Sequence, residues 1–114
     1  MEIDEILDYA LSLPDTEEAT PFGPDTVVVK HQGKIFLVLN LSKEPLSINY
    51  KASPEDIIIQ REDHPEYVIP GYHMNKKHWN TLIINRQMAT TFVQNLISAS
   101  YSLVHKKGKS INKI

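Results

Sequence analysis

The first residues of the chain show apolar and polar positions with the period of an α-helix. Between residues 2 and 13, apolar side chains recur at three- and four-residue intervals, which predicts a helix with one apolar face, ended by Pro14. They are Ile3, Ile6, Leu7, Ala10 and Leu11. Carboxylates near the N-terminal end complement the helix dipole. This acidic cluster is compatible with a hard-cation site and also with an ordinary solvated helix face.

The next segment carries strand patterns. Thr26 to Lys30 and Lys34 to Leu39 are β-branched or apolar runs around a turn in which Gly33 can adopt a positive φ. They predict a hairpin with Lys30 and Lys34 together at its tip. From Leu46 to Lys51, apolar and polar residues alternate, which predicts a third strand with one buried and one wet face. The residues expected on the wet face are Ser47, Asn49 and Lys51.

A second helix has a clear start signal. Ser53 can cap the helix, Pro54 can occupy its first position, and two carboxylates follow in the first turn. The helix contains Ile57 to Ile59 and ends before Pro65, which disfavours helical backbone at the residue before it. The sequence therefore predicts one short helix here.

The C-terminal part predicts a strand and a long helix. Trp79 to Ile84 alternates with period two, and Trp79 is expected to fill the core beneath the helices. Ala89 to Lys106 shows the spacing of an amphipathic helix, with Gly108 as its expected stop. Further short strands are expected at Ala19 to Phe22 and near Tyr72.

The order of these elements predicts an α+β fold, in which an antiparallel sheet carries its helices on one face. With 114 residues the chain is long enough for one core, so residues 1–114 are expected to form a single domain with a basic tail from about residue 106 to 114. There is no Cys, which removes disulfides and thiolate sites. The acidic N-terminus and the lack of a long apolar run predict a cytoplasmic protein without membrane contact.

Charge is divided unevenly along the chain. All fourteen Asp and Glu residues lie at or before Glu66, whereas the segment from Tyr67 to Ile114 contains seven Lys and Arg residues. Such a division is typical of a surface that faces a polyanion. It is equally compatible with a fold that interleaves its two halves, because the sign of a segment is not the sign of a surface.

The stretch from Pro70 to Leu82 has the highest density of polar and aromatic groups. It contains the single Trp, two His residues and the pair Lys76 and Lys77. Aromatic side chains beside a Lys pair are the mixture that stacks on bases and neutralises phosphate. The alternative interpretation is that Tyr72 and Trp79 anchor the core and the lysines are only solvated.

Several kinds of chemistry are poorly supported. No Gly-x-Ser-x-Gly motif or phosphate-binding glycine loop occurs, so a serine hydrolase and a nucleotide cofactor are not expected. His73 and His78 are five residues apart, which does not match the i, i+4 spacing of a helical zinc site. We therefore expect no metal and no cofactor. A general base at His73 or His78 would define an enzyme, but no partner acid is placed beside either residue.

The stretch from Pro70 to Leu82 resembles the signature of the MmcQ/YjbR family of small bacterial proteins. The resemblance continues through Leu13-Pro14, Pro21-Phe22-Gly23, Gly33-Lys34 and Ser100-Tyr101. It departs from the family pattern after Ile84, where residues 85–88 replace a more acidic lead into the last helix. The resemblance implies a two-layer CyaY-like (frataxin-like) fold, with a twisted antiparallel sheet and helices packed on one face, and a DNA-binding role inferred from paired hairpin wings.

Two hypotheses of function follow. The first is electrostatic, sequence-tolerant binding of nucleic acid by a monomer or homodimer. Its candidate contacts are Lys30, Lys34, Lys51, Lys76, Lys77, Arg86, Lys106 and Lys107. The alternative is a module that binds a small molecule or peptide in a pocket, because convergent polar groups beside aromatics suit such a site. The candidate pocket residues are Tyr72, His73, Asn75, His78 and Trp79.

Overall fold

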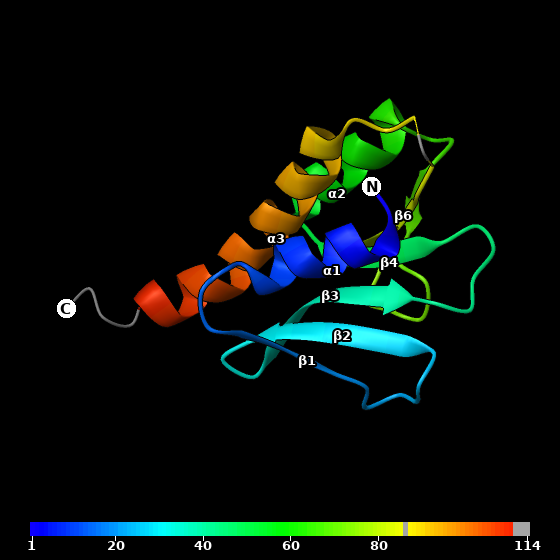
Figure 1. Cartoon of the computed structure of the whole chain (residues 1–114). Helices are drawn as coiled ribbons and strands as arrows, with labels where there is room; N and C mark the ends of the chain where they lie inside the picture. The colour runs from blue at the N-terminus through cyan, green and yellow to red at the C-terminus, as the bar shows by residue number, and fades with distance from the viewer. Residues whose placement is uncertain (86, 111–114) are drawn as a thin grey trace.

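Six strands form one antiparallel sheet in the order β1-β2-β3-β4-β6-β5. The computed structural model describes residues 1–85 and 87–110, with side chains up to residue 105. The elements are α1 (Ile3–Leu11), β1 (Thr16–Ala19), β2 (Thr26–His31), β3 (Lys34–Asn40), β4 (Ser47–Lys51), α2 (Pro54–Asp63), β5 (Val68–Pro70), β6 (Trp79–Ile83) and α3 (Thr90–Ser110). The helices α1 and α3 lie side by side across one face of the sheet, and α2 lies at the end near β6 (Figure 1).

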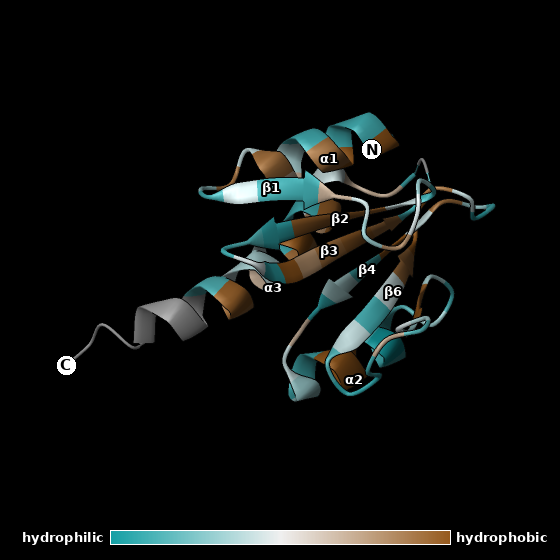
Figure 2. Ribbon diagram, turned by 90° about the horizontal axis from the view of Figure 1, so that it is seen from below, coloured by the Kyte–Doolittle hydropathy of each residue, from teal (hydrophilic) through white to brown (hydrophobic). Residues whose placement is uncertain are grey.

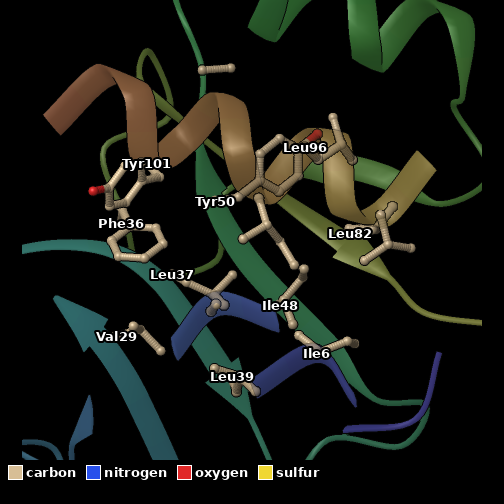
Figure 3. Packing of buried hydrophobic residues seen from close by; sticks show 14 of the residues in the cluster. Ile6, Val29, Phe36, Leu37, Leu39, Ile48, Tyr50, Leu82, Leu96 and Tyr101 are labelled. Carbon is tan, nitrogen blue, oxygen red and sulfur yellow. The ribbon is translucent and has the colours of Figure 1, made fainter. Parts of the chain in front are cut away.

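The main core lies between the sheet and these helices. Alternate residues of the central strands point toward the helices because side chains alternate between the two faces of a strand. Ile6 of α1 and Ile97 of α3 are fully buried in this core, together with Ile57 of α2. Figure 3 shows how Leu37, Ile48 and other strand residues pack there. We call the covered side the helix face and the other side the open face.

A β-bulge changes which residues of β3 reach the helix face. Val29 pairs with Leu37 and Lys30 with Ile35, so Phe36 is the extra residue on β3. As a result, Phe36 and Leu37 are both fully buried in the main core. Beyond the bulge, the pair His31 and Lys34 turns toward the helix face, and His31 packs against Tyr101 of α3.

Most of the elements predicted from the sequence are confirmed. The hairpin, the strand with alternating residues and the first helix appear within a few residues of the expected bounds. Ser53 caps α2 as expected, since its side chain accepts a hydrogen bond from the Asp56 backbone N–H. Of the two further short strands, β1 ends at Ala19, where the sequence predicted its start, and β5 ends at Pro70, close to Tyr72 as expected.

The expected helix stop at Gly108 is wrong. The long helix α3 continues through this residue to Ser110. A glycine inside a helix costs only about 1 kcal/mol relative to alanine, so one glycine does not oblige a helix to end.

The expectations for the open face also need correction. Trp79 does not lie beneath the helices, but packs on the open face with Val28 and Val38 in a second, smaller core cluster. Ser47 and Asn49 point to the open face as expected, yet they are buried rather than wet, with exposed fractions of 6% and 2%. Asn49 is covered by the loop around Tyr72, whose carbonyl accepts a hydrogen bond from the Asn49 side chain. Figure 2 views this side and shows a mainly hydrophobic β3, with more hydrophilic stretches on the next strands, β4 and β6.

Among the described residues, none of the helices has the length and apolar character that crossing a bilayer requires.

Candidate functional site

The loop of residues 71–78 leaves the sheet at β5 and returns to it at β6. Its first residue, Gly71, donates a backbone hydrogen bond of 3.1 Å to the Trp79 carbonyl. A Cβ atom at Gly71 would lie 2.8 Å from the Cβ of Trp79 and 2.9 Å from its carbonyl oxygen. Only glycine therefore allows the two ends of the loop to approach so closely.

Arg61 of α2 holds the far end of this loop. Its Nε donates a 2.7 Å hydrogen bond to Asn80 Oδ1, and its Nη2 reaches the backbone carbonyl of Lys76. On the helix face, Gln60 Oε1 accepts hydrogen bonds from both Tyr50 and Asn80. Burial raises the pKa of Tyr50 to about 12, partly offset by Asn80 and Arg61, so this hydroxyl stays a neutral donor. These contacts join α2, β4 and β6 beneath the loop.

Most of the loop's polar residues brace its backbone. The Lys77 backbone N–H donates to Asn75 Oδ1 at 2.9 Å, and the His78 carbonyl accepts from the Ala52 backbone. The Lys76 ammonium donates to the Gly71 carbonyl at 3.0 Å. Asn75 and His78, two of the predicted pocket residues, therefore lie in the braced turn of the loop.

Tyr72, His73 and Met74 instead fold over the open face. The Tyr72 N–H donates to Thr81 Oγ1 at 2.9 Å, and the Tyr72 carbonyl accepts from Asn49 Nδ2 at 3.3 Å. Met74 packs against the cluster that contains Trp79. His73 has a φ of 59°, a left-handed conformation that is uncommon for a residue other than glycine and often accompanies functional sites.

The hydrogen bonds beneath the loop converge on Asn49 Oδ1, which accepts from both Thr81 and Asn40. Thr81 Oγ1 accepts from the loop and donates to Asn49 Oδ1 at 2.7 Å. Asn40 Nδ2 donates to Ser47 Oγ at 3.0 Å and to Asn49 Oδ1 at 3.4 Å. Because its amide nitrogen is committed to these two acceptors, Asn40 keeps Oδ1 as an acceptor that no described donor reaches.

A pocket of about 420 Å³ lies on the open face between this loop, the 20–25 loop and the 41–46 loop. Its lining residues are Phe22, Thr26, Val38, Asn40, Ser42, Lys43, Asn49, Tyr72, His73 and Met74. Aromatic and apolar side chains form much of the wall, and the row of hydrogen-bonded amides described above supplies polar groups. This size and mixture are typical of small-molecule sites.

Lys43 and Tyr72 stand between this pocket and a smaller neighbour. The Lys43 Nζ lies 3.8 Å from the centroid of the Tyr72 ring, which is cation–π geometry. Both residues also line a second hollow of about 180 Å³ together with Ile69 and Thr81. The smaller hollow extends the site toward β5.

Of the five pocket residues predicted from the sequence, two line the pocket. Tyr72 and His73 do so, Asn75 and His78 belong to the brace, and Trp79 is buried beside Met74 in the second cluster. Sequence reasoning missed Phe22, Asn40 and Lys43. The alternation in β4 placed Asn49 on the correct face, but nothing local indicated which loops would cover it.

The predicted nucleic-acid contacts gather near one end of the sheet. Lys30, Lys34 and Lys51 lie where β2 ends, β3 begins and β4 ends, and Lys76 and Lys77 precede the start of β6. Lys30 and Lys34 do not stand together, because the pairs Lys30–Ile35 and His31–Lys34 point to opposite faces. Arg86 and the side chains of Lys106 and Lys107 lie outside the described residues.

Two of these lysines already have neighbours. Lys30 is directly opposite Glu17 of β1, so part of its charge is balanced locally. The Lys51 Nζ lies 5.7 Å from the centroid of the Trp79 ring. Among the described side chains, no group of three or more His, Asp or Glu residues is arranged to hold a metal ion.

The fold and the pocket together define an α+β protein with an open antiparallel sheet, helices on one face and a ligand-sized hollow on the other. The chain belongs to the YjbR family, whose model matches residues 11–103.

Known proteins agree with this assignment. The uncharacterized protein YbdF of Escherichia coli O157:H7 is 37% identical over 95 residues, which cover 83% of this chain and 77% of that protein. The uncharacterized protein YjbR of E. coli K12 is 27% identical over 89% of this chain and 85% of its own length. The crystal structure of Deinococcus radiodurans protein DR2400, with a DUF419 domain, has a TM-score of 0.86 and 32% identity, covering 93% of this chain and 80% of that one.

Proposed function

We propose that the chain is a binding module for a small molecule held on the open face of its sheet. The observation that supports this most strongly is the pocket of about 420 Å³, into which the 71–78 loop brings Tyr72 and His73. The loop is fixed to the sheet by Tyr72 and Thr81, and to α2 by Arg61. A preformed site of this kind binds without a large ordering cost.

The pocket offers three kinds of contact to a ligand. Asn40 Oδ1 is an acceptor, Lys43 and His73 are polar side chains at the wall, and Phe22 and Tyr72 present aromatic surface. Phe22 is 67% exposed and Tyr72 is 45% exposed. Large aromatic rings that remain this accessible beside a hollow are typical of binding surfaces.

Titration with three indole probes tests the pocket. We expect at least one of indole-3-acetate, indole-3-acetamide and tryptamine to shift the backbone NMR signals of Asn40, Asn49 and Tyr72. In Ser42→Trp, a bulky ring at the pocket wall should abolish these shifts. The matched control is Ser102→Trp on the exposed side of α3, which should bind as the parent does. Shifts that survive Ser42→Trp, or no binding by any probe at millimolar concentration, would contradict the proposal.

Nucleic-acid binding is a second candidate, supported by the gathering of Lys30, Lys34, Lys51, Lys76 and Lys77 near one end of the sheet. It would use the paired hairpin wings that the family resemblance implies, together with the region around Lys76 and Lys77. The sequence pI of about 6.2 opposes tight non-specific binding, because the acidic residues repel the same phosphates.

Salt dependence tests this second candidate. If the basic end neutralises three or four phosphates, log K should fall with log salt with a slope of about −3, because each contact contributes roughly −0.9. Replacing Lys76 and Lys77 by Ala should reduce the slope by about two units. The melting temperature should fall only slightly, because the single hydrogen bond from the Lys76 ammonium to the Gly71 carbonyl is lost. Fluorescence anisotropy on labelled duplex measures the slope for the parent and for the variant.

The matched control for this experiment is the double variant Thr90→Glu and Thr91→Glu, which lowers the net charge by the same amount. These residues are exposed in the first turn of α3, where carboxylates are tolerated by the helix dipole. The control should keep the parent slope. A slope that the lysine substitutions leave unchanged, or no binding at the lowest salt, would reject nucleic-acid binding while leaving the pocket proposal intact.

A further inference from the structure

The side chains that line the large pocket carry positive charge without any negative charge. Lys43 and His73 are the basic residues in the lining, and no Asp or Glu is among the ten lining residues. The acidic residues nearest in sequence are Asp25, which precedes β2, and Glu44, which lines only the smaller hollow. A pocket lined in this way favours an anion over a cation of the same shape.

Lys43 is the group best placed to receive that anion. Among the described residues, its ammonium makes no ion pair and lies 3.8 Å over the Tyr72 ring. A cation–π contact at an exposed site contributes only about 0.5–1 kcal/mol, whereas hydrogen bonds to charged groups contribute about 1.5–3 kcal/mol. A carboxylate in the pocket would therefore draw the ammonium into a stronger contact, and the Tyr72 ring would become free to stack.

The walls determine the shape of the ligand. Phe22 and Tyr72 present accessible aromatic rings, and Val38 and Met74 add apolar surface. A flat ring system gains most from such walls, because aromatic rings stack in offset or edge-to-face arrangements. The volume of about 420 Å³ accommodates a two-ring molecule with a short acidic side chain.

From these observations we infer that the pocket selects planar aromatic acids, with the acidic group at Lys43 and the ring between the aromatic walls. This inference rests on the proposed function, because it names the class of ligand for the same pocket. In this site Lys43 determines the preference for a negatively charged ligand over a neutral one. Tyr72 and Phe22 determine the preference for a flat ring system.

The same three indole probes test the selection, since they share one ring and differ in charge. Indole-3-acetate is negative, indole-3-acetamide is neutral and tryptamine is positive. We expect indole-3-acetate to bind about tenfold more tightly than the amide and tryptamine to bind most weakly. Raising the salt concentration should lower the affinity for indole-3-acetate and leave the affinity for the amide unchanged, because only indole-3-acetate binds through charge.

Two variants locate the source of the preference. Lys43→Met keeps the apolar stem of the side chain and removes its charge, so affinity for indole-3-acetate should fall about tenfold while that for the amide changes less than twofold. His73→Asn tolerates the left-handed backbone at this position and measures the smaller contribution of the imidazole. Thr91→Glu changes the net charge as Lys43→Met does, on the helix face, and should bind as the parent does.

The outcomes separate this inference from the function on which it rests. If the amide or tryptamine binds as tightly as the acid and Ser42→Trp still blocks binding, the pocket is a binding site but the anion selection is wrong. If the acid is preferred and Lys43→Met leaves that preference unchanged, the role of Lys43 is wrong. If no probe binds, both the function and the selection are rejected.

Discussion

Replacing Trp79 by Ala is expected to lower the free energy of unfolding by about 3–5 kcal/mol, the usual cost of deleting a buried aromatic side chain. Trp79 is 9% exposed and forms the second core cluster with Val28 and Val38. The neighbouring Lys51 adds little, because a cation–π contact contributes only about 0.5–1 kcal/mol at exposed sites. The loss is therefore a packing effect, and urea denaturation followed by circular dichroism measures it.

Phe22→Ala is the matched control, because it also removes an aromatic ring but from a side chain that is 67% exposed. Its effect on unfolding should stay within about 0.5 kcal/mol, while binding of an aromatic probe weakens. If Trp79→Ala unfolds at the parent's urea concentration, the smaller cluster does not stabilise the fold and the assignment of Trp79 as a packing residue fails.

Gly71→Ala is expected to cost about 1–3 kcal/mol, the range typical of an overpacked site. The added methyl group would lie 2.8 Å from Trp79 Cβ and 2.9 Å from the Trp79 carbonyl oxygen, both parts of a rigid strand. The loop must therefore move, which threatens the hydrogen bonds of Tyr72 with Thr81 and Asn49. The variant should lose probe binding as well as stability.

Gly33→Asn is the control for this substitution. Gly33 has a φ of 83° and open space around its missing Cβ, and asparagine adopts left-handed conformations more readily than most residues. We expect it to keep the parent's affinity for the probes and to unfold close to the parent. A Gly71→Ala variant that binds and unfolds as the parent does would show that the loop closes without the close approach to Trp79.

The candidate site was only partly predictable. Tyr72 and His73 are recognisable because the 70–82 stretch is dense in polar and aromatic residues, and both line the pocket. Lys43 and Phe22 come from segments 30 to 50 residues away, whose patterns indicate only turns. A pocket formed by three loops has no sequence period, so its membership cannot be counted from any one segment.

Arg61 shows the same limit for the supporting structure. In the sequence it is one of several charged residues near the end of a short helix, with nothing that distinguishes it. In the structure it reaches Asn80 and the carbonyl of Lys76 and so holds the loop in place. Such a role arises only when α2 packs beside β6.

The sequence by itself determined the local elements of this protein, because their signals act over a few residues. The Gly33 turn specifies the hairpin, Ser53 and Pro54 start α2, and alternation in β4 separates Ile48 from Asn49. Tertiary structure decided what each face meets. The Phe36 bulge, the burial of Asn49 under loops and the position of Trp79 on the open face all depend on contacts between distant segments. Packing free energy, which is shared among many partners, chooses these arrangements, and no local pattern records it.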